Sequence, residues 1–457
     1  MEDKVSRLRQ TLTRFIKDNR WILIAMLLLL AERLVALWQM GPMYTLDSDD
    51  ASYVISGIEF ANTGTITMHG VLSAQIMPGM PVLIGFFSLL FGEGLALWTV
   101  LKIVWILMGV FTAFYIYKSI AIFAPKWIGA LCAFLFMAMP NIVWMDNLIL
   151  TETPFMLFFT MMIYSTLMMG KTRESKYFWM CLVTYFLALM MKANIGIYPV
   201  FAFIYLCMAK YGIKKLLKQG LIIACVLLCF IVPWSIRNYI HYDAFIPLTY
   251  GAGNPMLLGT YQGVGYPADE DLDYETNVKQ VVREKYARYY DENGKISEPY
   301  LYRYILLEED GVKAKYRMQE WAKRDPVSMA KSYLYGKPRM MIFGVFYWKE
   351  LFGIPYSALR ILRALIFGGS IVSFLLACFR KKHWKEMIFL ALVYLGNIYV
   401  YAMSFAFDRY SETLMPAQYI ACGIGLFLFI DWIQAIVRKK KAAHAEKDAA
   451  SPSEAGA

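Results

Sequence analysis

Apolar residues occur in long continuous blocks along this chain, and not at the spacing of an amphipathic helix. The blocks at Trp21–Trp38, Ala96–Tyr117, Trp127–Trp144 and Leu414–Ile430 each approach the roughly 20 residues that a helix needs to cross the hydrocarbon of a bilayer. We therefore expect the core of the protein to be built in lipid, from membrane-spanning helices.

The composition agrees with this pattern and argues against other classes of protein. Of the 457 residues, 59% are hydrophobic and 18% are charged, whereas a soluble domain carries about 25% charged residues. The net charge is +11, but the basic residues lie in short loops, where they indicate topology and not a nucleic-acid partner. The seven cysteines have no metal-ligand or disulfide spacing, and the four histidines are widely scattered.

The distribution of Lys and Arg assigns the two sides of the membrane, because basic residues accumulate in cytoplasmic loops. Gly41–Gly94 contains none, so this stretch should lie outside, while the basic residues before the first block place the N-terminus inside. Further inside turns are marked by clusters at 118–126, 171–176, 210–218, 380–385 and 438–441. The alternation of inside and outside segments then requires about ten helices, with both termini cytoplasmic. We expect the protein to lie in the cell (plasma) membrane.

The same alternation of inside and outside segments bears on four shorter apolar stretches. Pro78–Gly92 and Pro338–Phe352 lie between outside segments and are short enough to be interfacial or re-entrant. Phe178–Met191 and Ile195–Met208 are also short. We expect two tilted or partly buried helices there.

A long hydrophilic segment, rich in Tyr and charge, separates two apolar regions. We predict an N-terminal transmembrane region 1–237 with catalytic outer loops, an extracytoplasmic segment 238–335, a C-terminal transmembrane region 336–441 and a disordered cytoplasmic tail 442–457. The fold class is therefore an all-α integral membrane protein, with interfacial helices in its first outer loop.

Three carboxylates fall just past the first apolar block, at Asp47, Asp49 and Asp50. One interpretation is a solvated turn with a helix N-cap, since Asp is favoured there. The other is a general base, because a hydroxyl or amine acceptor must lose a proton as it attacks a sugar carbon. Asp47 and Asp49 could also bind a divalent metal. The local pattern leaves these alternatives open.

The second predicted outer loop carries Asp146 and Glu152. They flank Leu148–Leu150, so their side chains can point in different directions. Thr151–Pro154 has the pattern of a helix start, with a Thr cap and Pro in the first turn. Acidic groups from two loops on the same face could still converge on one site, and ionisable residues beside a membrane are candidates for function.

Three basic residues are predicted near the outer face, at Lys192, Arg237 and Arg409. Arg suits phosphate because its planar fork donates two hydrogen bonds at once. The alternative is that each side chain extends toward lipid headgroups, and for any one of them alone this alternative is favoured. Glu32 and Arg33, inside the first block, are most simply explained by a local neutralising contact.

Several segments together resemble the GT-C glycosyltransferases, in particular the branch of protein O-mannosyltransferases and aminoarabinose (lipid A) transferases. Asp49–Tyr53 resembles the Asp-Glu-x-x-Tyr segment of their first outer loop, and Met77–Pro81 stands where the family often has Pro-Pro-Gly-Tyr-Pro. Leu150–Phe155 is similar to a Ser/Thr-Glu-Pro-Leu-Phe loop, with one residue inserted. Pro233–Tyr239 looks like Pro-Trp-x-x-Arg-Asn-Tyr, and Asp408–Tyr410 is similar to a late Arg-Tyr segment.

The resemblance implies direct displacement with inversion at a sugar carried on undecaprenyl or dolichyl phosphate and presented from the outer leaflet. Asp49 matches the first acidic position and would be the base, with Asp50 and Glu152 as further catalytic candidates. Arg237 or Arg409 would bind the departing lipid phosphate, where negative charge develops. Lys192 is the third candidate for that phosphate.

Four residues are expected to line the donor or acceptor pocket: Asp47, Tyr53, Asp146 and Asn238. The chain departs from the family pattern in having Asp50 in place of Glu, and Met at two positions of the Pro-rich segment. The acceptor therefore stays open between a glycan, a lipid and a protein. We expect no required cofactor, with a divalent metal as the alternative.

Three other functions compete with this interpretation. A transporter or flippase often shows internal repeats and broken helices, but the two halves show no repeat, and the acidic residues cluster in outer loops. A polysaccharide ligase or polymerase of another membrane fold would not need a carboxylate base in the first loop. A scaffold without chemistry predicts that Asp49→Asn is silent.

Overall fold

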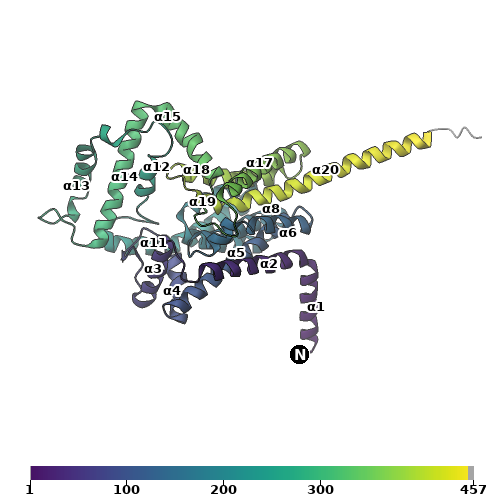
Figure 1. Ribbon diagram of the computed structural model, residues 1–457, viewed down its shortest axis with the longest axis horizontal. Helices are drawn as coiled ribbons and strands as arrows, with labels where there is room; N and C mark the ends of the chain where they lie inside the picture. The colour runs from purple at the N-terminus through teal and green to yellow at the C-terminus, as the bar shows by residue number, and fades with distance from the viewer. Residues whose placement is uncertain (1, 451–457) are drawn as a thin grey trace, which may run out of the picture.

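Long apolar helices run side by side through the centre of the molecule (Figure 1). The computed structural model describes residues 2–450. Within this range seven helices are long and apolar enough to cross a membrane, the last being α20 together with the short α19 (Asp408–Glu412). The seven are α2 (Arg20–Met40), α5 (Leu95–Ile120), α8 (Glu152–Thr172), α11 (Ile213–Tyr242), α17 (Tyr356–Arg380), α18 (Trp384–Ala402) and α20 (Met415–Ala450). The all-α membrane fold is therefore confirmed.

The expected number of spans, about ten, is too high by this criterion. One expected span is broken into α6 (Lys126–Met137) and α7 (Pro140–Asp146), bent by 72°, and counting this pair brings the described spans to eight at most. Pro140 begins the second helix because it lacks the N–H that an ongoing helix would need. The two short helices expected next are α9 (Ser175–Met191) and α10 (Tyr198–Met208), which fall below the length of a full span.

The chain between α2 and α5 folds into two short helices joined by a hairpin. These elements are α3 (Asp49–Thr63), β1 (Thr67–Met68), β2 (Val71–Leu72) and α4 (Gly79–Phe91), and α3 packs against α4. The hairpin turn is formed by two residues with positive φ, His69 at 54° and Gly70 at 78°, as a type I′ turn requires. The apolar stretch after Pro78 is thus a helix too short to span.

Gly79 begins α4 at a point where two backbones meet. A Cβ atom built on Gly79 would lie 2.4 Å from the carbonyl oxygen of Met190, near the end of α9. Only glycine allows this approach, because a backbone carbonyl cannot move aside as a flexible side chain can. The glycine of the Pro-Gly-Met-Pro segment therefore fixes the first loop against the helical bundle.

We expect Gly79→Ala to lower the free energy of unfolding by about 2 kcal/mol, as overpacking does. The measurement is the melting temperature of the detergent-purified protein. Gly220→Ala is the matched control, because Gly220 lies inside α11 and a Cβ atom added to it would meet nothing within 4 Å, and alanine in a helix interior is mildly stabilising. Equal melting temperatures for the two variants would contradict the packing argument.

The hydrophilic segment after α11 forms a helical layer at one end of the bundle, on the left in Figure 1. Its helices are α12 (Gly253–Gly259), α13 (Val281–Lys285), α14 (Pro299–Arg324), α15 (Pro326–Lys331) and α16 (Lys337–Phe343), with short turns of 3-10 or π-helix between them. Tyr242, Tyr250, Tyr286 and Tyr304 lie in its small core. The boundary predicted at 237/238 falls within α11, because that helix continues to Tyr242.

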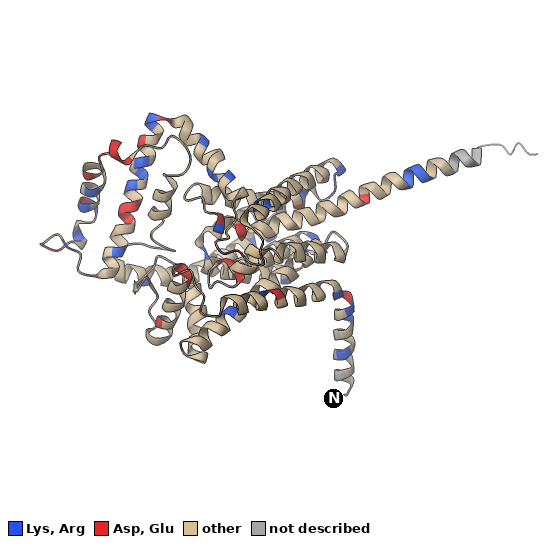
Figure 2. Ribbon diagram, viewed as in Figure 1, with Lys and Arg blue, Asp and Glu red and all other residues tan. Residues whose placement is uncertain are grey.

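The first and last described helices lie at the opposite end of the bundle from this layer (Figure 2). There α1 (Glu2–Asp18) turns away from α2, and α20 extends beyond the other helices; Lys and Arg gather on both. Because α20 continues to Ala450, it runs past residue 442, where a disordered tail was predicted to begin. Residues 451–457 of that tail lie outside the described residues.

Buried charges inside the bundle are paired between helices that are distant in sequence. Arg33 on α2 contacts Asp146 at 2.8 Å, closer than its neighbour Glu32 at 3.8 Å. The predicted local contact is therefore present, but the nearer partner of Arg33 is the distant Asp146. Arg363 and Glu412 form a second buried pair, at 2.8 Å. Such pairs are needed because an unpaired charge is costly in an apolar interior.

Lys337 joins the hydrophilic layer to the loop that precedes α19. Its side chain is fully buried, its Nζ donates a hydrogen bond to the Ser404 carbonyl oxygen at 2.9 Å, and it lies 3.5 Å from the centre of the Tyr333 ring. Among the described residues no carboxylate forms an ion pair with it. Burial lowers the pKa of the Lys337 ammonium to about 7.

This lowered pKa predicts a pH dependence of stability. Between about pH 7 and pH 10 the unfolded chain binds more protons at this position than the folded chain, so stability rises with pH. We expect the melting temperature to rise between about pH 7.5 and pH 9.5 in the wild type, and the rise to be smaller in Lys337→Met. An identical rise in both proteins would assign the effect to other groups.

Candidate active site

Two side chains of α5 hold the first and second loops together. The Nζ atom of Lys102 donates hydrogen bonds to the carbonyl oxygens of Tyr44, at 2.8 Å, and Asn147. Trp105, one turn further along, donates to the Leu150 carbonyl at 2.8 Å. The loop before α3 and the loop before α8 therefore have a common support, and this brings the acidic residues that follow each loop to the same place.

Asp49 and Glu152 converge on Arg409. The Nη2 atom of Arg409 lies 2.9 Å from the Asp49 carboxylate, and its Nε atom lies 2.9 Å from the Glu152 carboxylate. The Glu152 side chain is fully buried, Arg409 is 11% exposed and Asp49 is 32% exposed. Asp49 is therefore the carboxylate of this cluster that a substrate can reach most easily.

Lys192 completes the cluster from the end of α9. Its Nζ atom lies 2.7 Å from the same Glu152 oxygen that faces Arg409, and it is positioned over the rings of Phe155 and Tyr410. Burial lowers the pKa of the Lys192 ammonium, and the Glu152 carboxylate opposes that shift. Two cations thus share one buried carboxylate.

Tyrosines enclose this cluster. Tyr53, one turn after Asp49 on α3, is buried, and its pKa is raised first by burial and then by the Asp49 carboxylate. Its phenol therefore stays protonated. Tyr410 stacks on Tyr401 of α18, with ring centres 4.8 Å apart. We call the set Asp49, Tyr53, Glu152, Lys192, Arg409 and Tyr410 the carboxylate–cation cluster.

Two predicted site residues of the first loop, Asp47 and Asp50, are occupied in other contacts. Asp50 is buried, and its carboxylate accepts hydrogen bonds from the backbone N–H groups of Leu46, at 2.8 Å, and Ser48, at 3.4 Å. Asp47 is exposed, and its carboxylate accepts a hydrogen bond from the Thr45 hydroxyl at 3.0 Å.

Asp146 points into the bundle. There its carboxylate meets Arg33 and accepts a hydrogen bond from the Thr153 hydroxyl at 2.8 Å. Asp146 and Glu152 therefore do point in different directions, and only Glu152 belongs to the carboxylate–cation cluster.

Arg237 and Asn238 lie at a second location, near the hairpin. Arg237 donates hydrogen bonds to the Ser73 carbonyl, at 3.1 Å, and to the side-chain oxygen of Asn238, at 2.8 Å. Asn238 in turn donates to the Ile246 carbonyl at 2.8 Å. In the described structure these two residues connect α11 to neighbouring loops and make no ion pair with the cluster.

The described residues do not gather the ligands of a metal site. Among them, no three side chains of His, Cys, Asp or Glu come together in a way that could hold an ion. Asp49, one half of the proposed metal pair, is engaged by Arg409, and Mg²⁺ or Ca²⁺ would need six or more oxygen ligands. We therefore derive no step of the chemistry through a metal.

A large cavity is lined by Asp408, the residue before Arg409, and by no residue of the carboxylate–cation cluster. It has a volume of about 1340 Å³ and is lined by apolar residues of α16, α17 and the 405–407 loop. Three basic residues also line it: Lys331, Arg339 and Arg360. A cavity with an apolar wall and positive charges suits a molecule that has an apolar chain and an anionic group.

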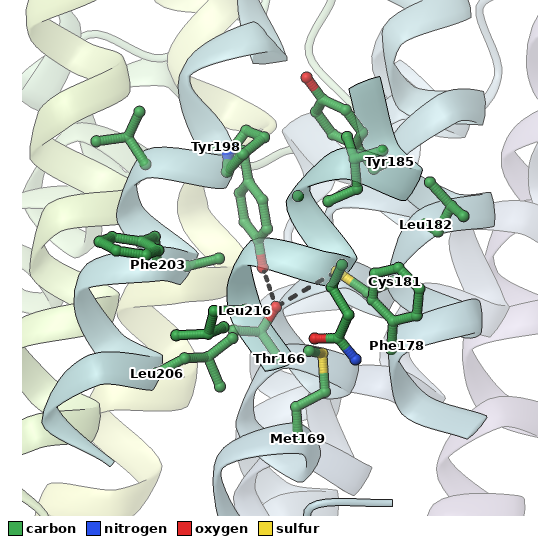
Figure 3. Close-up of a pocket in the computed structure, with 16 residues that line it drawn as sticks. Thr166, Met169, Phe178, Cys181, Leu182, Tyr185, Tyr198, Phe203, Leu206 and Leu216 are labelled. Carbon is green, nitrogen blue, oxygen red and sulfur yellow. Dashed lines mark hydrogen bonds between the residues drawn. The ribbon is translucent and has the colours of Figure 1, made fainter. Parts of the chain in front are cut away.

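A smaller cavity, of about 320 Å³, lies deeper in the bundle between α8, α9, α10 and α11 (Figure 3). The Thr166 and Tyr198 hydroxyls lie 2.8 Å apart, the Cys181 sulfur lies 3.5 Å from Thr166, and Gln219 and Tyr185 also line the cavity. It contains no charged residue. This cavity can hold hydrocarbon but offers no group for acid–base chemistry.

One segment of the chain matches a known family model. Residues 76–236 match the model of the family described as dolichyl-phosphate-mannose-protein mannosyltransferase. This segment is similar to that family. It contains Glu152 and Lys192 of the cluster and excludes Asp49 and Arg409, and it covers roughly a third of the chain. The sequence has no significant match among curated proteins.

Solved structures give the fold of the whole chain. The oligosaccharyltransferase AglB from Archaeoglobus fulgidus, in complex with an inhibitory peptide and a dolichol-phosphate, aligns with a TM-score of 0.54 at 14% identity, over 94% of this chain and 52% of AglB. Its apo form gives a TM-score of 0.52 at 13% identity, over the same 94% and 52%. ArnT from Cupriavidus metallidurans bound to undecaprenyl phosphate aligns at 14% identity over 90% of this chain and 78% of ArnT, with a TM-score of 0.40.

The chain thus spans about half the length of AglB. Together with the mannosyltransferase-family segment, this likeness confirms the GT-C fold that the sequence motifs indicated. The family match also includes the two short helices α9 and α10, and Lys192, which directly follows α9.

Sequence reasoning missed the residues that position the cluster. Lys102 is one of two charges in a 26-residue apolar helix, and the other, Lys118, lies in its last turn; an ionisable residue inside a membrane segment is a candidate for function by default. That signal could have singled it out. The partnership of Arg33 with Asp146, in contrast, joins residues 113 positions apart and leaves no local pattern.

Because Lys192 and Arg409 both contact the Glu152 carboxylate, neutralising it should lower the stability of the fold. Glu152→Gln leaves Lys192 buried without its carboxylate, so we expect the free energy of unfolding to fall by about 3 kcal/mol. The control is Glu174→Gln, whose pair with Lys176 is exposed at 47% and 64% and should contribute less than about 1 kcal/mol. Thermal melting in detergent measures both. Comparable melting temperatures would mean that the cluster does not stabilise the fold.

Proposed function

We propose that this protein is a glycosyltransferase that moves a sugar from a polyprenyl-phosphate-linked donor to an extracytoplasmic acceptor by inverting displacement. The observation that carries this proposal is the convergence of Asp49, Glu152, Lys192 and Arg409 at one end of a membrane bundle. A reachable carboxylate beside buried cations is the arrangement that proton abstraction and phosphate departure both need.

Asp49 is the proposed general base. Its carboxylate is the most exposed of the acidic groups in the cluster. In the reaction, the acceptor oxygen or nitrogen attacks the anomeric carbon, its proton passes to Asp49, and the bond from that carbon to the phosphate oxygen breaks. The bonding electrons leave with the polyprenyl phosphate. Attack opposite the leaving group inverts the anomeric centre.

Arg409 and Lys192 are the proposed partners of the departing phosphate. Both cations are nearly buried, at 11% and 10% exposure, and a charge-assisted bond to phosphate is strengthened where water is excluded. Arg237, the third candidate, binds the Ser73 carbonyl elsewhere, so we assign it to positioning of the hairpin.

The donor is proposed to enter through the cavity beside Asp408. Its apolar wall suits an isoprenoid chain, and Lys331, Arg339 and Arg360 suit the phosphate. The description of the matching family names a dolichyl-phosphate sugar, and the AglB structure holds a dolichol-phosphate. Both agree with a lipid-phosphate carrier here.

We further propose that the cluster faces the outside of the cell, with both termini in the cytoplasm. Lys and Arg gather on α1 and the end of α20, opposite the hydrophilic layer (Figure 2), and basic residues are retained on the cytoplasmic side. The site would then meet extracytoplasmic glycans, lipids or proteins as acceptors.

The first test offers the detergent-purified protein a panel of polyprenyl-phosphate sugars together with a membrane extract as the acceptor source, and measures free polyprenyl phosphate. We expect Asp49→Asn to lower turnover by about 100-fold or more, because the amide cannot take the proton. Asp47→Asn is the matched control, since that exposed carboxylate contacts only Thr45 in the described structure, and its turnover should stay near the wild-type value.

Two outcomes would contradict the proposal. Undiminished release by Asp49→Asn would remove Asp49 from the chemistry. No release by folded wild-type protein from any donor, with or without EDTA, would favour transport of a lipid-linked glycan. The EDTA arm also decides the metal alternative, because loss of turnover that Mg²⁺ or Mn²⁺ restores would require an ion.

A further inference from the structure

A second polar group lies beside Asp49 and is formed by segments outside the carboxylate–cation cluster. It consists of Ser52 on α3, His69 at the hairpin turn, Gln75 after the hairpin and Arg303 on α14. The Ser52 hydroxyl lies 3.4 Å from Nδ1 of His69, and the Gln75 side-chain oxygen lies 3.4 Å from both Nε and Nη2 of Arg303. We call these four residues the rim group.

The hairpin fixes the place of His69. Its φ of 54° is followed by 78° at Gly70, in a turn closed by β1 and β2. Because Ser52 follows Asp49 by three residues on the same helix, the two side chains share one face of α3. His69 therefore lies next to the proposed base.

Charges connect the rim group to the base. The pKa of His69 is lowered by burial and by the positive charge of Arg303, and the Asp49 carboxylate opposes this shift. His69 is thus within electrostatic range of both Arg303 and Asp49, and the imidazole is neutral at neutral pH. Its ring can accept or donate one hydrogen bond at each nitrogen.

The guanidinium N–H groups of Arg303 have no anionic acceptor among the described residues. Its described contacts are two long hydrogen bonds to a neutral amide oxygen, and no carboxylate of the described chain forms an ion pair with it. Arg409 differs, since it already faces two carboxylates. A partly buried guanidinium without an anion matches an incoming carboxylate or phosphate bidentately.

We propose that Arg303, supported by His69, binds an anionic group of the acceptor, either a phosphate or a carboxylate, while a hydroxyl or amine of the same acceptor reacts at Asp49. This inference rests on the proposed function and names the class of acceptor. It gives α14 of the hydrophilic layer a specificity role, and it leaves Arg409 and Lys192 to the donor. Arg303 and His69 act by positioning and take no part in bond breaking.

The test uses the membrane extract separated by anion exchange into a neutral and an anionic fraction. With the purified protein and its polyprenyl-phosphate sugar, we expect turnover mainly with the anionic fraction. Arg303→Gln should raise the apparent KM for that fraction by about tenfold or more, the effect of losing a charge-assisted hydrogen bond, and leave the donor KM and turnover at saturating acceptor unchanged. Arg303→Lys should restore part of the affinity.

Arg324→Gln is the matched control, because Arg324 lies at the other end of α14 in exposed pairs with Asp271 and Glu320. Equal KM values for Arg303→Gln and wild type, a preference for the neutral fraction, or a raised donor KM would each overturn the inference. Wild-type turnover in these same assays shows that the proposed function itself stands.

A binding measurement keeps the inference testable if no donor turns over. The probes are octyl glucoside, octyl glucuronide and octyl glucoside 6-phosphate, with thermal stabilisation as the readout. We expect one or both anionic probes to raise the melting temperature more than the neutral probe does, and this difference to vanish in Arg303→Gln but persist in Arg324→Gln. The two anionic probes separate carboxylate from phosphate. Equal shifts in all three proteins would refute the rim group as an anion site.

Discussion

The buried guanidinium of Arg409 is the constraint on which the functional end of this protein depends. A charge removed from water must be paired, and Arg409 is paired with Asp49 on α3 and with Glu152 at the start of α8. The pair with Asp49 joins residues 360 positions apart. Three segments that are far apart in the sequence therefore have to meet, and Lys192 can then share Glu152.

Other buried polar contacts hold the segments that carry these charges. Lys102 ties the loops before α3 and α8 to α5 through the carbonyls of Tyr44 and Asn147. Gly109 on the same helix lies so close to Asp146 that a Cβ would come within 2.0 Å of its carboxylate, and Asp146 in turn binds Arg33. In lipid, no water is available to form hydrogen bonds with these groups. Each contact therefore limits how far its helix can move, and the site is held as rigidly as the bundle.

The sequence predicts most of the fold because hydrocarbon imposes a simple rule on helix length and charge. The apolar blocks became helices, and the stretch after Pro78 became a helix too short to span. The break at Pro140 was missed, because the block around it is apolar throughout. Asp49, Glu152, Lys192 and Arg409 could be nominated from their loops. That Asp146 and Arg237 lie outside the cluster could not be predicted from the sequence, since it depends on their distant partners, Arg33 and the Ser73 carbonyl.

The charge balance of the cluster bears on how the proposed reaction would begin. Without substrate, two carboxylates and two cations neutralise one another, and Asp49 is held by Arg409. An incoming lipid phosphate would compete with Asp49 for the guanidinium, and it has the geometric advantage of a bidentate contact. Glu152, fully buried between Lys192 and Arg409, would keep both cations in place during that exchange. Asp49 would then lose its partner at the moment the donor is bound, so its carboxylate would become free to take the acceptor proton only when a sugar is ready to be transferred.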